Sequence, residues 1–105
     1  MTHAPTHRAI EAVWRIESAK VVAGVARLVR DVGLAEEFAQ DALVAALEHW
    51  PAEGVPDNPG AWLMTTAKHR ALDRLRQDAL HARKHAKALR ARLQPVRVEQ
   101  GAGLG

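Results

Sequence analysis

The chain has 105 residues, which is the length of one small domain with a modest hydrophobic core. Apolar residues make up 48% of it, which excludes a composition typical of disorder, and the absence of cysteine excludes disulfide bonds and thiolate metal sites. No apolar run approaches the roughly 20 residues that span a bilayer, and the N-terminus lacks the apolar core of a signal peptide, so we expect a cytoplasmic protein without a membrane partner.

Charge is divided unevenly along the chain. Up to residue 67 the sequence has five Lys and Arg against nine Asp and Glu, whereas from Lys68 to Arg97 it has ten against two. An acidic half followed by a basic half indicates two different partners, one of them an anion such as nucleic acid. A basic tail that only improves solubility is the alternative interpretation of the same pattern.

The first predicted helix spans about residues 8–32 and follows a disordered end at 1–7. Its pattern repeats at three- and four-residue steps, through Ile10, Val13, Trp14, Glu17, Val21, Val25, Leu28 and Val29. Ser18 is also a candidate cap for a second helix, so the segment is either one bent helix or two. Gly24 predicts the close approach of another helix, and Gly33 suits the left-handed position that ends a helix.

The second predicted helix spans residues 34–50 and has two contrasting faces. One face is a wide apolar stripe, formed by Ala35, Phe38, Ala39, Ala42, Leu43, Ala46, Leu47 and Trp50. The opposite face carries Glu36, Glu37, Gln40, Asp41 and Glu48. This helix contains no Lys or Arg, although solvated faces commonly mix both signs, so the face is either merely solvated or shaped for a basic partner. We expect Pro51 to end the helix.

Residues 51–60 are rich in Pro and Gly and predict a loop. Asn58 and Pro59 suit the N-cap and the first position of a third helix over residues 60–76. The predicted buried stripe of that helix consists of Leu63, Met64, Ala67, Ala71 and Leu75.

A basic helix is expected to continue from the third helix over residues 77–93, and Gln94-Pro95 is expected to end it. We therefore predict an all-α chain, a compact domain of three to four helices with a basic C-terminal helix. Its predicted parts are a domain at 8–80, a basic helical extension at 81–93 and a flexible tail at 94–105.

No residue set supports an enzyme, a metal site or a bound cofactor. Gly-rich phosphate loops, HExxH and nucleophile motifs are absent from the sequence. His81 and His85 share a helix face at i,i+4 spacing, but two ligands beside Lys84 and Lys87 do not make a cation site. We expect both histidines to be solvated.

The third helix predicts contact with nucleic acid. Its candidate residues are Lys68, His69, Arg70, Arg74 and Arg76. Lys and Arg bind phosphates through charge, and Arg also reads base edges. Trp62, at the start of the helix, is either a stacking surface for an unpaired base or a cap over the core under the 51–60 loop.

Two segments in this order, LAEEFAQDALVAALEHW and NPGAWLMTTAKHRALDRLR, carry a resemblance to a known family. Together with the Pro/Gly loop between them, they resemble region 2 of bacterial sigma factors of the extracytoplasmic-function type. The resemblance covers about residues 8–80 and is a long ordered pattern, which makes it specific.

The resemblance implies an all-helical domain with two binding surfaces. In this family the acidic helix docks on the clamp helices of the RNA polymerase β′ subunit, which implies that role for Glu36, Glu37, Gln40 and Asp41. The loop before the last helix and that helix hold flipped non-template-strand bases of the promoter minus-ten element and open the duplex. The DNA-contact candidates implied here are Asn58, Trp62, Lys68, His69, Arg70, Arg74 and Arg76. An anti-sigma factor is a further candidate partner.

The sequence is consistent with two other functions. The chain could be a helical interaction domain that binds a basic partner through its acidic face, without DNA activity. A cationic helix at 68–93 lying on an anionic membrane is the third possibility, and its lack of a large aromatic or leucine face ranks it last. Relatives in the family carry a second, helix-turn-helix domain that these residues do not include, so we expect weak binding to promoter DNA and tighter binding to the polymerase clamp.

Overall fold

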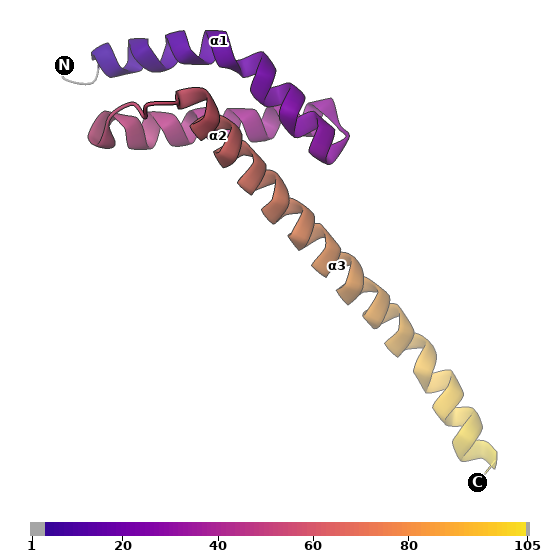
Figure 1. Cartoon of the computed structure of the whole chain (residues 1–105). Coiled ribbons are helices and arrows are strands. Elements are labelled where there is room, and N and C mark those ends of the chain that lie inside the picture. Colours follow the sequence, from indigo (N-terminus) through magenta and orange to yellow (C-terminus); the bar gives the residue numbers. More distant parts are fainter. Residues whose placement is uncertain (1–3, 105) are drawn as a thin grey trace. The chain divides into compact units, whose positions relative to one another are not determined.

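The computed structural model describes the backbone of residues 4–104 and the side chains of residues 5–93. It contains three helices, α1 (Ala4–Val29), α2 (Val32–Glu53) and α3 (Pro59–Leu104), and the described residues form no strand (Figure 1). The predicted all-α class is therefore confirmed. The chain divides into two units, Met1–Asp73 and Arg74–Gly105. None of the helices in the described part of the chain has a stretch long and apolar enough to cross a membrane.

α1 is one continuous helix, so Ser18 does not begin a second one. Its end differs from the prediction, because Arg30 and not Gly33 takes the left-handed conformation, with φ 58°. The Arg30 N–H donates to the Ala26 carbonyl over 2.7 Å. A non-glycine residue in this conformation costs about 1–2 kcal/mol. Arg30 takes it because the next residue, Asp31, is already the N-cap of α2. The Asp31 side chain accepts a hydrogen bond from the Leu34 N–H at 3.0 Å.

α2 continues one turn past the predicted end. Pro51 lies inside its last turn, and the helix ends at Gly54, whose φ is 91°. The Gly54 N–H donates to the Trp50 carbonyl over 2.8 Å. The sequence rule fails here because a proline in the last turn removes only one helical hydrogen bond, while the burial of Trp50 and the glycine cap hold the turn in place.

The start of α3 agrees with the prediction. The Asn58 side chain accepts a hydrogen bond from the Ala61 N–H at 3.1 Å, and Pro59 is the first helical residue. Residues 77–93 continue α3 without a break, as expected. The backbone of α3 is helical to Leu104, so the predicted end at Gln94-Pro95 is wrong. The side chains of the predicted tail at 94–105 lie outside the described residues.

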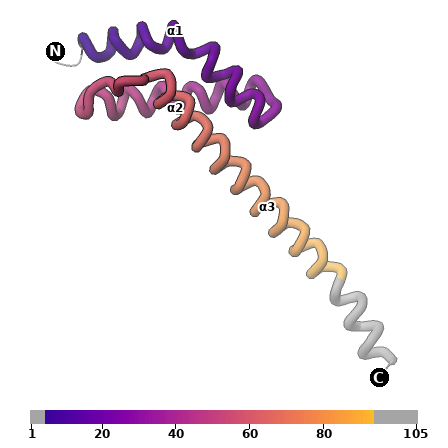
Figure 2. Tube along the Cα trace, viewed as in Figure 1, coloured from indigo at the N-terminus to yellow at the C-terminus, as the bar shows by residue number. Residues whose placement is uncertain are grey.

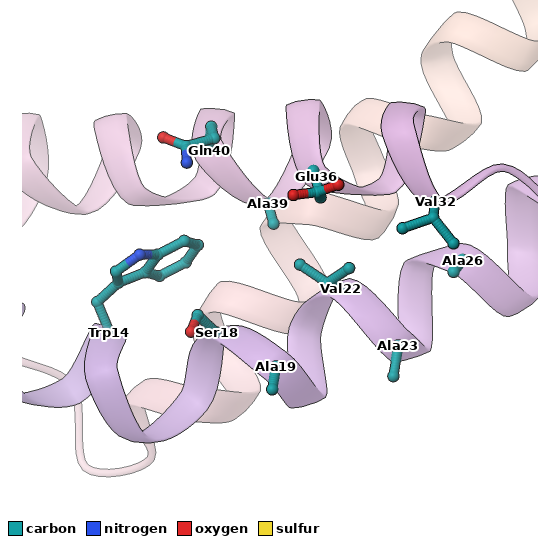
Figure 3. Close-up of a pocket in the computed structure, with 10 residues that line it drawn as sticks. All are labelled: Trp14, Ser18, Ala19, Val22, Ala23, Ala26, Val32, Glu36, Ala39 and Gln40. Carbon is teal, nitrogen blue, oxygen red and sulfur yellow. The ribbon is translucent and has the colours of Figure 1, made fainter.

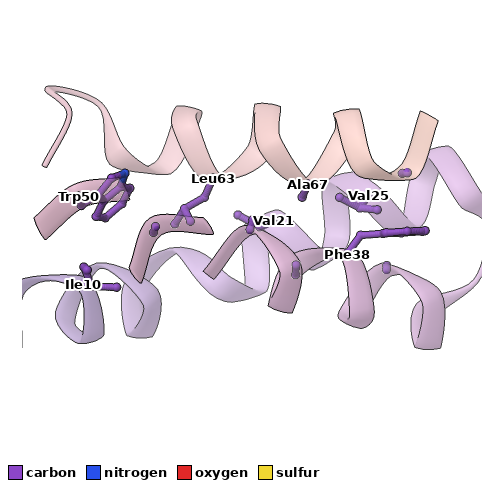
Figure 4. Close-up of a cluster of buried hydrophobic side chains, with 12 residues drawn as sticks. Ile10, Val21, Val25, Phe38, Trp50, Leu63 and Ala67 are labelled. Atoms are coloured by element: carbon purple, nitrogen blue, oxygen red, sulfur yellow. The ribbon is translucent and has the colours of Figure 1, made fainter. Parts of the chain in front are cut away.

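The core of the first unit lies where α1, α2 and the first turns of α3 meet (Figure 4). α1 and α2 run side by side in opposite directions (Figures 1 and 2). The buried cluster consists of Ile10, Val21, Val25, Ala35, Phe38, Ala39, Ala42, Ala46, Trp50, Leu63, Ala67 and Ala71. Half of these are alanines, so the helix axes can approach closely and each large side chain fills a defined gap. Three leucines that the periodicity placed in the core, Leu28, Leu47 and Leu75, are about 40% exposed.

Two glycines show how closely the first unit is packed. A Cβ on Gly24 would lie 2.6 Å from Cε of Met64, which confirms the predicted close approach of another helix, here α3. A Cβ on Gly60 would lie 2.5 Å from Oε1 of Glu17. The half-buried Glu17 carboxylate of α1 therefore sits at the N-terminus of α3, where negative charge is favoured by the helix dipole.

Candidate functional site

The first candidate surface is the outer face of α2, which we call the acidic face (Glu36, Glu37, Gln40 and Asp41). All four side chains are exposed. Their orientation follows from the opposite side of the helix, where Ala35, Phe38, Ala39 and Ala42 are buried in the core. Because residues three and four apart share a helix face, burying one stripe turns the acidic face toward solvent.

The charges of the acidic face are not balanced within the domain. α2 contains no Lys or Arg. Glu11–Arg15, His49–Glu53 and Arg74–Asp78 form ion pairs among the described side chains, and none of these three pairs involves the acidic face. A concentrated negative patch of this kind raises the encounter rate with a basic surface and selects for it.

An open groove of about 530 Å³ runs beside the acidic face, between α1 and α2 (Figure 3). Its floor and walls are mostly apolar, with Trp14, Ala19, Val22, Ala23, Ala26, Val32 and Ala39. Glu36 and Gln40 form its α2 rim, and Ser18 lines it from α1. Apolar surface next to a charged rim is the usual composition of a protein-binding patch. The sequence did not indicate this groove, because six of its ten lining residues come from α1 and four from α2.

The second candidate surface begins at the loop between α2 and α3. Asn58 is exposed, but its side-chain oxygen is engaged in capping α3. Only the amide NH₂ group is left to donate to a ligand. Asn58 is therefore a helix cap whose amide NH₂ group stays exposed, and a substitution can separate these two features.

Trp62 is half-buried and packs its ring against Trp50 in an edge-to-face arrangement, with 5.2 Å between the ring centroids and 69° between the planes. It is one of the partly buried residues that pack on the core cluster. Such aromatic pairs contribute about 0.5–1.5 kcal/mol beyond area burial. The structure therefore shows the core-capping role that the sequence left as one of two alternatives for this residue.

The basic residues of α3 in the first unit do not form one continuous surface. Lys68, His69 and Arg70 are all exposed. Lys68, however, lines a hollow of about 390 Å³ together with Leu72 of the same helix and with Gly24, Arg27 and Leu28 of α1. The periodicity places His69 and Arg70 on the side of α3 that carries Trp62. Arg27 was missed by sequence reasoning because it lies 41 residues before Lys68 and only packing brings the two cations together.

The remaining basic candidates belong to the second unit. Arg74 and Arg76 are exposed there. The Arg74 Nε lies 3.5 Å from Oδ1 of Asp78 in an i,i+4 pair, and such surface pairs contribute only about 0.3–0.5 kcal/mol. His81 and His85 are exposed, and no group of three His, Cys, Asp or Glu side chains suited to a metal ion is found among the described residues.

Comparison with known proteins places these features in a family. The sigma-70 region 2 model matches residues 15–80. The ECF RNA polymerase sigma factors SigK of Mycobacterium sp. (strain KMS) and Mycobacterium sp. (strain JLS) are each 32% identical to the chain over 91 residues, which are 83% of this chain and 46% of theirs. An uncharacterized protein of Rhizobium meliloti (strain 1021) is 38% identical over 53 residues, which are 50% of this chain and 12% of that protein.

The chain thus spans about half the length of the SigK relatives. No solved structure matches it. The region 2 match covers more than half of the chain and includes α2, the loop and the start of α3. With the three-helix fold and the resemblance found in the sequence, it establishes that the chain belongs to the sigma-70 region 2 family.

Proposed function

We propose that this chain is the part of a transcription initiation factor that docks on core RNA polymerase through the acidic face. The family is not an enzyme family. The observation that carries the proposal is the acidic face itself: exposed, without a cation on its helix, and outside the ion pairs of the described residues. Its partner would be the arginine-rich clamp helices of the β′ subunit, and the neighbouring apolar groove would exclude water at the edge of that contact.

The second half of the proposal concerns promoter DNA. The loop ending at Asn58 and the first turns of α3 would hold non-template-strand bases of the minus-ten element. Flipping a base out of the duplex costs a few kcal/mol, which contacts to the base and to phosphates must offset. The exposed charges of Lys68 and Arg70 support phosphate contact, with Arg74 and Arg76 of the second unit as further candidates. Trp62, packed on Trp50, would form a wall of the base pocket.

Such a factor works where the polymerase is, so the proposal places the protein in the cytoplasm. An anti-sigma factor would be expected to compete with polymerase for region 2. No metal or cofactor has a role in either half of the proposal.

Replacing Asp41 by lysine should weaken binding to a β′ clamp-helix fragment by about tenfold or more, because it puts a cation opposite the basic clamp. The measurement is a titration of the fragment, labelled with a fluorophore, with the full chain at two salt concentrations. The affinity of the wild type should fall as salt rises, since exposed charges are screened over about 10 Å at 0.1 M salt.

Glu48→Lys is the matched control for this experiment. Glu48 is an exposed acid on the same side of the helix but outside the four residues of the acidic face, roughly 10 Å further along the axis than Asp41. It should change affinity by less than about threefold, because only overall charge is altered. Equal losses of affinity in both variants would show that the acidic face contributes only through overall charge. If the wild type did not bind the fragment, an interaction domain with another basic partner would be favoured.

Replacing Asn58 by serine should leave stability nearly unchanged but weaken binding of a single-stranded minus-ten oligonucleotide by about three- to tenfold. Serine caps a helix as well as asparagine does but lacks the amide donor. The assay is fluorescence anisotropy of the oligonucleotide with the chain and polymerase core together, with thermal melting as the check on the cap. Unchanged DNA affinity would show that Asn58 acts only as a helix cap.

A further inference from the structure

The second unit carries an apolar stripe that the proposed function does not use. On α3 the residues Leu75, Ala79, Ala82, Ala86, Leu89 and Leu93 follow one another in alternating steps of four and three; we call them the α3 seam. This is the spacing of the a and d positions in a coiled coil, and it is sustained over nearly three heptads. Because these steps keep every member on one side of the helix, the seam forms a continuous strip.

The seam is exposed along its whole described length. The side chains of residues 74–93 are all exposed, and Leu75, Leu89 and Leu93 have exposed fractions of 40%, 45% and 70%. Helices in water draw most of their stability from packing an apolar face rather than from propensity. A heptad strip of leucine and alanine that stays exposed is the surface that a second helix covers.

The charged residues beside the seam indicate what kind of second helix could bind it. From Arg74 to Leu93 the sequence has seven Lys and Arg against one Asp. On a helical wheel, Arg83, Lys87 and Arg90 lie along one flank of the seam, and no acidic residue lies among them. In an antiparallel pair of two copies of this helix, these cations would face their own counterparts, so that arrangement is disfavoured.

We propose that the α3 seam docks an acidic amphipathic helix of a partner protein. Apolar side chains of the partner would cover the leucines and alanines, and its carboxylates would pair with Arg83, Lys87 and Arg90. Neither the acidic face of α2 nor the loop at Asn58 takes part, so this inference stands apart from the proposed function. A nucleic-acid arm is the competing explanation for so basic a helix, and it requires charge but no seam.

The test uses the full chain and a synthetic helical peptide of roughly four heptads, with leucine at a and d and glutamate at e and g. Binding is measured by fluorescence anisotropy at about 0.1 M salt. A second peptide with the same leucines but lysine at e and g checks the charge requirement. Leu89→Gln interrupts the seam, and Leu80→Gln is its matched control, because Leu80 is 42% exposed but lies off the seam. Leucine and glutamine have similar helix propensity, so helicity is preserved and is checked by circular dichroism.

The acidic peptide should bind the wild type at least about tenfold more tightly than the lysine peptide. Leu89→Gln should weaken this binding by about tenfold, and Leu80→Gln by less than about twofold. Arg90→Glu should likewise cost more than Lys84→Glu, which places the same charge reversal on the opposite side of the helix. The proposal would be overturned by equal losses at Leu89 and Leu80, by absence of peptide binding, or by seam-dependent dimers in sedimentation. It would also be overturned if an oligonucleotide bound more tightly than the peptide and Leu89→Gln had no effect on that binding.

Discussion

Replacing Trp50 by alanine is expected to lower the free energy of unfolding by about 3–5 kcal/mol, the largest loss from a single substitution in this chain. Trp50 is 2% exposed, is the largest of the fully buried side chains and lies in the cluster where α1, α2 and α3 meet. Its removal also leaves Trp62 without its edge-to-face partner. In a domain whose total stability is of the order of 5–15 kcal/mol, this loss would remove between about a fifth and all of that stability.

Trp50→Phe is the informative comparison. The Nε1 atom of Trp50 has no hydrogen-bond partner among the described residues, and an unsatisfied buried donor costs about 1–3 kcal/mol. Phenylalanine loses part of the packing but also removes that donor, so its cost should be less than half that of alanine. Urea denaturation followed by circular dichroism measures both variants. A phenylalanine variant as unstable as the alanine variant would show that the indole N–H is satisfied in solution.

Replacing Ala42 by leucine is expected to destabilise the first unit by about 1–3 kcal/mol or more, because there is no space for the added atoms. Ala42 is 0% exposed and belongs to the same cluster as Val21 and Val25 of α1. A larger side chain at this point would push apart the helices that meet in the cluster. Since the groove beside the acidic face is built from both helices, binding to the clamp fragment should also weaken.

Ala12→Leu is the control, because it makes the same alanine-to-leucine change at a site where the added atoms meet no neighbours. Ala12 is exposed on α1, so leucine there should change stability by less than about 0.5 kcal/mol. Urea denaturation and the clamp titration are both measured, and the clamp affinity is compared at a temperature where each variant is fully folded. Full stability in the Ala42 variant would mean that the interface between α1 and α2 tolerates more volume than this packing implies.

Local signals in the sequence were enough to find the helices and one of their caps. The stripe through Ala35, Phe38 and Ala42 predicted both the buried side of α2 and the exposure of the acidic face, because helical periodicity alone separates the two. Asn58-Pro59 predicted the start of α3 for a similar reason, as the cap is made within four residues. The resemblance to region 2 was confirmed by comparison with known proteins.

Two of the predictions that failed concern positions where two local preferences compete. Gly33 suited the end of α1, but Asp31 caps α2 and thereby moves the left-handed position to Arg30. Pro51 suited a helix end, but the burial of Trp50 and the cap at Gly54 carry α2 past it. In both places the outcome depends on which cap and which side chain are held by the rest of the domain.

The sequence by itself determined the helical class, the side of α2 that is acidic, and the charge division between the two halves of the chain. These follow from spacing and composition, which act within a few turns of a helix. Only the tertiary structure decided that Trp62 packs on Trp50 and that Arg27 and Lys68 line the same hollow. It also decided that the groove lies beside Glu36 and Gln40, and that Leu28 and Leu47 stay exposed. Each of these depends on which helices meet and at what distance, and that is set by small residues such as Gly24 together with the partner side chains they admit.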